Sequence, residues 1–219
     1  MTTLKKYKTL VFDCDGVILD SNKVRAQAFY NAALPYGKQH AEALYAYHLI
    51  HGGVSRYIKF EAFLRDMVKV PATDEAMKTL LHNFTTEARI GLLQCPVAPG
   101  LEALRKATPD ARWILVSGAD EQELRDVFVE RGIDSMFDGG IFGSPSNKDV
   151  ILERELASGS LQKPAIFFGD SRYDHEAATS AGLDFVFVSG WTDFASWAQY
   201  CAENHIQTIE RLDKTLLSP

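Results

Sequence analysis

Four short apolar runs, each ending where polar residues or glycine begin, constrain the fold of this chain most. Their length and continuous hydrophobicity are typical of strands that are buried on both faces of a parallel sheet. The runs are Thr9–Phe12, Arg112–Val116, Ala165–Phe168 and Asp184–Val188. Stretches with helical spacing alternate with them at residues 101–107, 121–131, 149–156 and 173–181. This alternation predicts an α/β fold with a doubly wound, Rossmann-like parallel sheet, which binds ligands at the carboxyl ends of its strands.

The segment from about residue 21 to residue 94 breaks this alternation, because it contains amphipathic helical patterns and no convincing strand. Breaks in the helical pattern are expected at residues 35–37, 51–53 and 71. Pro96 then marks the return of the strand–helix pattern. The predicted domains are a core of residues 1–20 and 96–219 and an inserted α-helical cap of residues 21–95.

Acidic side chains follow the first and the third apolar run. Asp13 and Asp15 end the first run, where alternate residues of an extended chain share a face, and Gly16 allows a sharp turn. Asp170 and Asp174 follow the third run. If the two strands are neighbours, up to four carboxylates converge, which is unfavourable unless a cation neutralises them or some of them take up protons. Oxygen ligands without histidine or cysteine favour Mg²⁺ over zinc.

Two further segments offer groups that suit a bound phosphate. Ser117 and Gly118 follow the second run, where we expect a helix to begin and its free N–H groups to bind anions. Serine at such a turn is otherwise a helix cap. Lys148 lies in the expected first turn of a helix with a capping pattern over residues 146–149. A cation there opposes the helix dipole, and a bound anion would relieve this mismatch.

The composition limits the partners and the compartment of the protein. A formal net charge of -6 argues against nucleic acid or an anionic membrane surface as the main partner. Cys14, Cys95 and Cys201 are far apart and form no zinc or redox spacing, so we expect free thiols in a reducing compartment. The apolar run after the basic N-terminus is too short for a signal peptide or a membrane span. A cytoplasmic location is therefore expected.

Taken together and in this order, the motifs resemble those of the haloacid dehalogenase-like superfamily of aspartate-nucleophile phosphotransferases. The similarity is to members of the phosphoglycolate phosphatase and β-phosphoglucomutase-like kind, whose helical cap is inserted at the position of the irregular segment. The matching stretches are Asp13-Cys-Asp15-Gly-Val, Ser117, Lys148 and Gly169-Asp170-Ser-Arg-Tyr-Asp174.

The resemblance implies two catalytic aspartates. Asp13 would attack phosphorus and form an aspartyl-phosphate, which divides one difficult displacement into two steps. Asp15 would protonate the leaving oxygen and then act as a base towards water. Dehalogenases and phosphonate-cleaving relatives lack an acid at the position of Asp15, so its presence favours phosphate esters.

The resemblance also implies a metal site and a phosphate site. Mg²⁺ would be held by Asp13, Asp170 and the backbone carbonyl of Asp15, and Asp174 would orient a metal-bound water. The phosphoryl oxygens would be neutralised by Ser117, the Gly118 amide and Lys148.

The cap segment His51-Gly-Gly-Val-Ser-Arg56 resembles a stretch of the β-phosphoglucomutase-like members. Its glycines would let a loop dip over the active site. The resemblance implies that Arg56 points inward and holds the distant anionic end of the substrate, as a guanidinium does well. No histidine is expected to be catalytic, and His48 and His51 are assigned capping or surface roles.

The sequence therefore predicts a Mg²⁺-dependent phosphatase that hydrolyses a small phosphorylated metabolite, such as a sugar or sugar-acid phosphate, through an aspartyl-phosphate. A phosphomutase of the β-phosphoglucomutase type is the alternative, because it needs nearly the same residues. A non-catalytic phospho-switch of the receiver type fits less well with the large helical insertion. We expect a monomer or a weak homodimer, with neither nucleic acid nor membrane as a partner.

Overall fold

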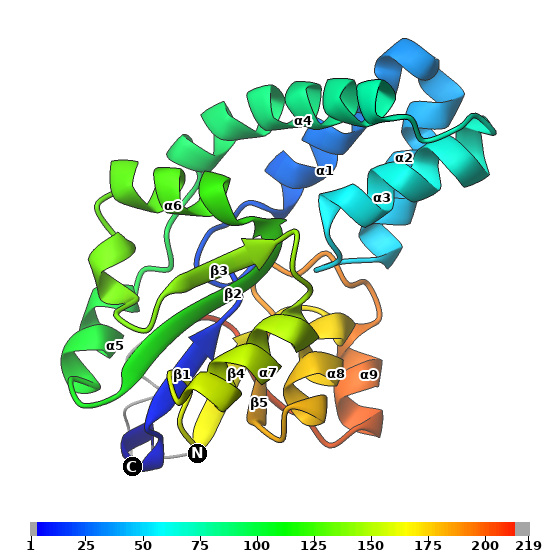
Figure 1. Ribbon diagram of the computed structural model, residues 1–219. Helices are drawn as coiled ribbons and strands as arrows, with labels where there is room; N and C mark the ends of the chain where they lie inside the picture. The colour runs from blue at the N-terminus through cyan, green and yellow to red at the C-terminus, as the bar shows by residue number, and fades with distance from the viewer. Residues whose placement is uncertain (1–3, 213–219) are drawn as a thin grey trace.

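The computed structural model describes residues 4–212, which form a sheet-based core and a group of helices beyond it (Figure 1). The core has a six-stranded sheet in the order β3-β2-β1-β4-β5-β6, and every neighbouring pair is parallel. The strands are β1 (Thr9–Phe12), β2 (Arg112–Asp120), β3 (Ile141–Ser144), β4 (Ala165–Gly169), β5 (Asp184–Val188) and β6 (Gln207–Ile209). The predicted doubly wound sheet is confirmed, and the four predicted strands are its central ones.

The two strands that the sequence pattern missed form the edges of the sheet. Strand β3 has four residues, two of them glycine and serine, and β6 has three residues of which two are exposed. Neither has the continuous apolar run that marks a strand with two buried faces. Strand β2 also continues beyond its predicted end at Val116 as far as Asp120.

The side chains of the central strands alternate between two apolar clusters, one on each face of the sheet. Leu10 and Phe12 of β1 belong to the larger cluster, whereas Val11 between them belongs to the smaller one. The larger cluster includes residues of α5 (Leu101–Ala107) and α6 (Glu121–Glu130). The smaller cluster includes residues of α7 (Lys148–Ser158) and α8 (Arg172–Ser180). All four of these helices match predicted helical stretches, whereas α9 (Trp197–Glu203) was not predicted.

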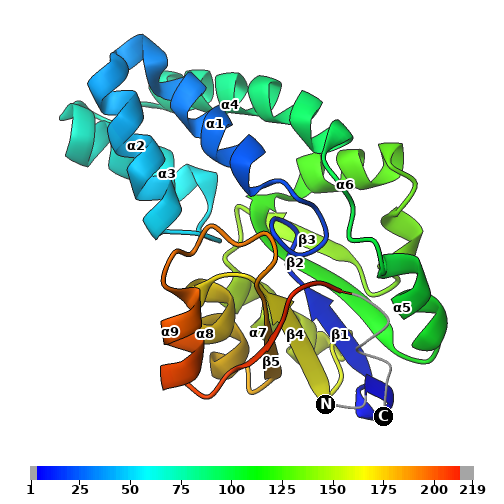
Figure 2. The same ribbon diagram turned by 180° about the vertical axis from the view of Figure 1, so that it is seen from behind.

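A second group of helices follows β1 and lies beyond the carboxyl ends of the strands (Figure 1 and Figure 2). We call this group the cap. Its elements are α1 (Asn22–Ala33), a 3₁₀ turn (Leu34–Tyr36), α2 (Lys38–Ile50), α3 (Arg56–Ala62), a π-helical segment (Phe63–Val68) and α4 (Asp74–Gln94). The helices are interrupted at the predicted breaks, and no strand lies between residues 22 and 94. The domain boundaries at residues 20 and 95 stay a prediction.

The helices of the described chain are not of the membrane-spanning kind. Within residues 4–212, none is both long enough and apolar enough to cross a bilayer.

Candidate active site

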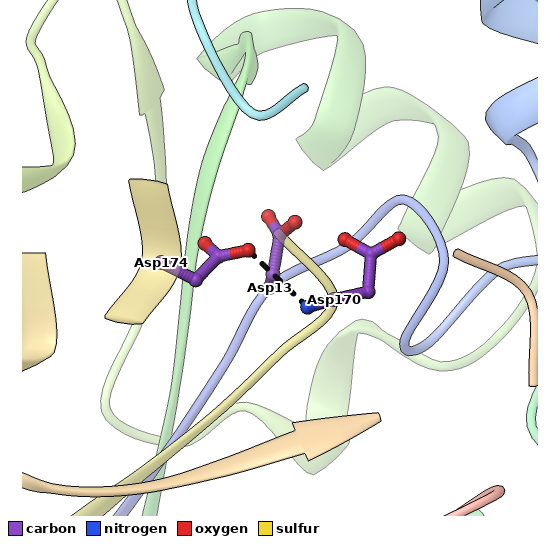
Figure 3. A group of neighbouring side chains, drawn as sticks. All are labelled: Asp13, Asp170 and Asp174. Atoms are coloured by element: carbon purple, nitrogen blue, oxygen red, sulfur yellow. Dashed lines mark hydrogen bonds between the residues drawn. The ribbon is translucent and has the colours of Figure 1, made fainter. Parts of the chain in front are cut away.

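Three aspartates lie together at the carboxyl ends of β1 and β4 (Figure 3). The two strands are neighbours in the sheet, and the Asp13 N–H donates to the Phe168 carbonyl at 2.9 Å, so the segments that carry the acids start side by side. One carboxylate oxygen each from Asp13, Asp170 and Asp174 lies within 4.8 Å of the other two, and all three residues are buried. The structure therefore brings together Asp13 of the first run with Asp170 and Asp174 of the third run, whereas Asp15 is not part of this group.

Lys148 is the cation at this cluster. It is the first residue of α7 and follows Asn147, whose side chain makes no capping hydrogen bond, contrary to the predicted capping pattern. The Lys148 Nζ lies 2.9 Å from Asp13 Oδ1 and also donates to Asp174 Oδ1. Burial would lower the pKa of Lys148, but these two carboxylates raise it above its usual value. The helix dipole mismatch is thus relieved by protein carboxylates.

One ammonium group does not neutralise three buried carboxylates. Burial raises the pKa of Asp13 to about 7, and the nearby Asp174 and Asp15 add to the effect while Lys148 opposes it. Burial, followed by Asp13 and Asp174, raises the pKa of Asp170 well above its usual value. Without a further cation the cluster must therefore take up protons near neutral pH.

The local geometry fits a divalent cation held by Asp13 and Asp170. Within residues 4–212, Asp13 Oδ1 is the buried side-chain oxygen that accepts no well-aligned hydrogen bond, despite its ion pair with Lys148. A Cβ at Gly16, which has a φ of +80°, would lie 2.0 Å from Asp170 Oδ2, so only glycine leaves room for this carboxylate. The donors are all hard oxygens, the ligands that Mg²⁺ prefers.

Asp174 differs from the other two acids because the protein occupies both of its oxygens. Its Oδ2 accepts hydrogen bonds from the Asp170 N–H at 3.2 Å and from the N–H and hydroxyl of Ser171 at 3.0 and 2.6 Å. Its Oδ1 accepts from Lys148. Asp174 thereby fixes both the loop after β4 and the Lys148 side chain, and its role towards a metal-bound water stays a prediction.

Asp15 has partners that the sequence pattern did not identify. Its Oδ1 accepts from the Ser21 hydroxyl at 2.5 Å and from Arg25 Nε at 3.0 Å. Burial opposes the change, but Arg25 and Ser21 lower the pKa of Asp15. Asn22, also missed, donates to Asp170 Oδ2 at 2.8 Å. Ser21, Asn22 and Arg25 lie at the start of α1, shortly after the acidic motif, and this position is the feature of the sequence that could have identified them.

Ser117 and Gly118 lie inside β2 and not at the start of a helix, which corrects the sequence expectation. Strand β2 has an irregularity after Val116 and pairs again at Asp120, so the strand continues past both residues. Asp120 caps α6 instead, accepting from the Glu123 N–H at 3.0 Å. The Ser117 hydroxyl accepts from the Ala119 N–H at 3.1 Å.

A cavity of about 630 Å³ separates the cap from this end of the core. Of the predicted site residues, Asp13, Asp15, Ser117, Gly118, Asp170 and Arg56 line it, whereas Lys148 and Asp174 are not among its lining residues. The loop between α2 and α3 passes directly over the core. A Cβ at Gly118 would lie 2.1 Å from the Gly53 carbonyl oxygen, and a Cβ at Gly53 would lie 3.7 Å from Lys148 Nζ. Glycine at these positions permits the close approach.

Arg56 lines the cavity but already has a carboxylate partner in the protein. Its guanidinium forms an ion pair with Glu123 of α6 and donates to the Thr85 hydroxyl at 3.0 Å. Glu123 also accepts from Arg25 at 2.5 Å. Buried charges thus connect Arg56 of the cap, through Glu123 and Arg25, to Asp15. The predicted contact of Arg56 with substrate stays a prediction, and Glu123 is the competing partner.

Comparisons with known proteins agree with this geometry. The family of haloacid dehalogenase-like hydrolases matches residues 7–182. No curated protein sequence matches the chain. Among solved structures, a predicted phosphoglycolate phosphatase from Haemophilus somnus 129PT is 17% identical, with a TM-score of 0.72 and coverage of 96% of this chain and 97% of that chain.

Two further structures share the fold at low identity. A predicted phosphatase from Clostridium acetobutylicum is 16% identical, with a TM-score of 0.74 and coverage of 96% of both chains. CbbY from Rhodobacter sphaeroides in complex with xylulose-(1,5)bisphosphate is 15% identical, with a TM-score of 0.71 and coverage of 97% of this chain and 100% of that chain. Because the family match spans most of the sequence and the sheet, the cap and the acidic cluster accompany it, this chain belongs to the haloacid dehalogenase-like hydrolases.

Proposed function

We propose that the protein is a Mg²⁺-dependent phosphatase that hydrolyses small phosphate monoesters of the sugar or sugar-acid class through an aspartyl-phosphate on Asp13. The observation that carries the proposal is the environment of Asp13. Its buried carboxylate has one oxygen without a well-aligned hydrogen bond, touches Lys148, and lines the cavity beside Asp15. A carboxylate held in this way has its lone pairs available for attack.

Asp13 and Asp170, with the carbonyl of Asp15, would hold the ion. When bound, Mg²⁺ keeps the crowded carboxylates ionised and neutralises charge on the transferring phosphoryl group. Lys148 holds Asp13 in place and adds positive charge at the same point. Ser117 and Gly118 line the cavity where phosphoryl oxygens would lie. Positioning and charge stabilisation of this kind supply most of the rate enhancement in phosphoryl transfer.

Asp15 would carry protons in both halves of the reaction. In the first half, Asp13 displaces the alcohol from phosphorus, and the leaving oxygen takes a proton from protonated Asp15, whose lowered pKa makes this form a strong acid. In the second half, water gives a proton to Asp15 and attacks the aspartyl-phosphate, which releases inorganic phosphate and restores Asp13. Arg25 and Ser21 both bind Oδ1 of Asp15, so Oδ2 is left for the transferred proton.

The cavity limits the substrate class. Its volume of about 630 Å³ suits a small metabolite, since pockets for small molecules commonly span ~300–1,000 Å³. Two neighbours have names that fit this class, a predicted phosphoglycolate phosphatase and CbbY bound to xylulose-(1,5)bisphosphate. We propose no nucleic-acid or membrane partner, a monomeric or weakly dimeric state and a cytoplasmic location.

A screen of phosphorylated metabolites with added Mg²⁺, measuring released inorganic phosphate, tests the proposal. Wild-type protein should release phosphate, chelation with EDTA should stop it, and Asp13→Asn should be inactive. Asp110→Asn, which changes an exposed aspartate of the core, serves as the matched control and should stay active. Full activity of Asp13→Asn or activity in EDTA would contradict the mechanism. An isomerised sugar phosphate as the main product would instead indicate the phosphomutase.

A further inference from the structure

Three buried cationic side chains of the cap line the cavity, and they differ in their partners. Arg25 forms ion pairs with Asp15 and Glu123. Arg56 forms an ion pair with Glu123. Lys59 of α3, by contrast, has no carboxylate within ion-pair distance among residues 4–212. Two of the three charges are therefore compensated by the protein and the third is not.

The surroundings of Lys59 use only part of its hydrogen-bonding capacity. The side chain is 1% exposed, and its Nζ lies 2.8 Å from His48 Nδ1 and 5.2 Å from the centre of the Phe29 ring. Burial, followed by Lys59 and Arg25, lowers the pKa of His48 to about 2, so the imidazole is neutral and Nδ1 accepts the hydrogen bond. An ammonium group has three donors, and this contact uses one of them. The expected capping or surface role of His48 is thus replaced by a contact inside the cap.

A buried cation without a counter-charge is unfavourable, and its environment shows that cost. Burial, together with Lys148 and Arg25, lowers the pKa of Lys59 to about 7, and only Asp15 opposes them. A methionine would fill the same space against Phe29 without this cost. The ammonium group is therefore poorly explained by packing and well explained by an anion that reaches it from the cavity.

The position of the pair makes such a contact reasonable. Lys59 and His48 line the same cavity as Asp13 and Asp15, and they belong to the opposite, cap-side wall. A substrate whose phosphoryl group lies at Asp13 would extend towards the cap. Arg56 on the same helix is the other candidate, but Glu123 already binds its guanidinium.

We propose that Lys59, held by His48, binds a second anionic group of the substrate, a carboxylate or a second phosphate, at the end opposite the reacting phosphoryl group. This inference rests on the proposed phosphatase function and narrows its substrates to phosphate esters with an anionic tail. Lys59 is a specificity-determining residue in this account, and it takes no part in the transfer of the phosphoryl group.

Calorimetric binding measurements in an Asp13→Asn background test the inference without interference from turnover. Two matched pairs of probes are needed, phosphoglycolate with 2-hydroxyethyl phosphate and xylulose 1,5-bisphosphate with xylulose 5-phosphate. In each pair only the first member has the anionic tail, and the two pairs separate a carboxylate from a phosphate tail. In the pair whose anionic member the protein prefers, Lys59→Met should weaken binding of that member by about 10- to 100-fold more than binding of the member without the anionic tail. This is the loss expected for one charged hydrogen bond.

Two further variants complete the test. Lys59→Arg should recover part of the preference because it keeps the charge, and Lys78→Met, an exposed lysine of α4, should leave the preference unchanged. Equal weakening of both members in Lys59→Met would show a structural role and overturn the inference. The inference would also be overturned if the Asp13→Asn protein with Lys59 unchanged showed no preference for the anionic member of either pair. This measurement does not depend on whether a Lys59 variant folds. Selective binding together with no hydrolysis by the wild type would support the subsite and contradict the phosphatase.

Discussion

The two walls of the cavity carry opposite imbalances of charge. On the core side, Asp13, Asp170 and Asp174 are buried together, and the one lysine beside them, Lys148, forms ion pairs with Asp13 and Asp174, so negative charge is in excess. On the cap wall, Arg25 and Arg56 are paired but Lys59 is not, so positive charge is in excess. Each imbalance indicates which ligand would compensate it, a divalent cation at the core and an anionic group at the cap. The core would then determine the reaction and the cap would determine the substrate.

Removal of Lys148 should have the largest effect, because among residues 4–212 it is the only cation that forms an ion pair with the cluster of Asp13, Asp170 and Asp174. Lys148→Met should lower kcat about 100- to 1000-fold, as expected when one charge-stabilising donor is lost. Steady-state kinetics at saturating Mg²⁺ measure this. Lys106→Met, at an exposed lysine, should match the wild type. A loss of less than ten-fold for Lys148→Met would contradict the assigned role.

The ion pairs between cap and core offer a comparison of buried with exposed charges. Glu123→Gln leaves Arg25 and Arg56 buried without their shared carboxylate, and should lower the free energy of unfolding by about 3 kcal/mol. Glu130→Gln removes the partner of Arg89 in an exposed pair, and should cost less than about 1 kcal/mol. Urea unfolding measures both, and equal costs would show that the buried connection is not important for stability.

The contact of the cap loop with β2 should be sensitive to one methyl group. In Gly118→Ala the new Cβ would lie 2.1 Å from the Gly53 carbonyl oxygen, so the loop has to move. We expect about 1–3 kcal/mol of lost stability and a higher KM. Gly52→Ala is the control, because its Cβ would lie at an ordinary 3.6 Å from Ser171 Cβ. Thermal unfolding and kinetics of the two variants should therefore differ, and identical behaviour would contradict a close approach of loop and strand in solution.

The uncompensated charge of Lys59 predicts a pH dependence of stability. Its pKa of about 7 lies below the ordinary 10.5, so between these values the unfolded chain binds more protons and stability rises with pH. Arg25, Asp15 and Lys148 affect this pKa, and His48 stays neutral. From pH 7 to pH 9 the stability of the wild type relative to Lys59→Met should increase by on the order of 1–2 kcal/mol. A stability difference between the two proteins that does not change from pH 7 to pH 9 would show that the charge of Lys59 is compensated in the folded protein.

Local patterns in the sequence predicted most of the core. Continuous apolar runs identified the four central strands, and the acids at the ends of β1 and β4 followed from the topology of a parallel sheet. The edge strands were not predicted because β3 is short and includes glycine and serine, and two of the three residues of β6 are exposed. Ser117 was placed at a helix start because the pattern did not show that β2 continues to Asp120.

The charge partners of the cap could not be predicted in the same way. Arg56 and Glu123 are 67 residues apart in the sequence, and no local period connects them. Lys59 and His48 come from different helices, and their burial depends on how α2 and α3 pack. Such pairs are determined by tertiary structure, so a sequence pattern shows the charged residues without showing which of them remain unpaired.

Trapping of the phosphorylated enzyme tests the central claim most directly. In Asp15→Asn the second half of the reaction loses its base, so an aspartyl-phosphate formed slowly should accumulate. Mass spectrometry of that variant after incubation with substrate and Mg²⁺ should find one phosphoryl group on the peptide that contains Asp13, and none when Asp13→Asn is added. A phosphoryl group on another residue, or turnover by Asp13→Asn, would contradict the account.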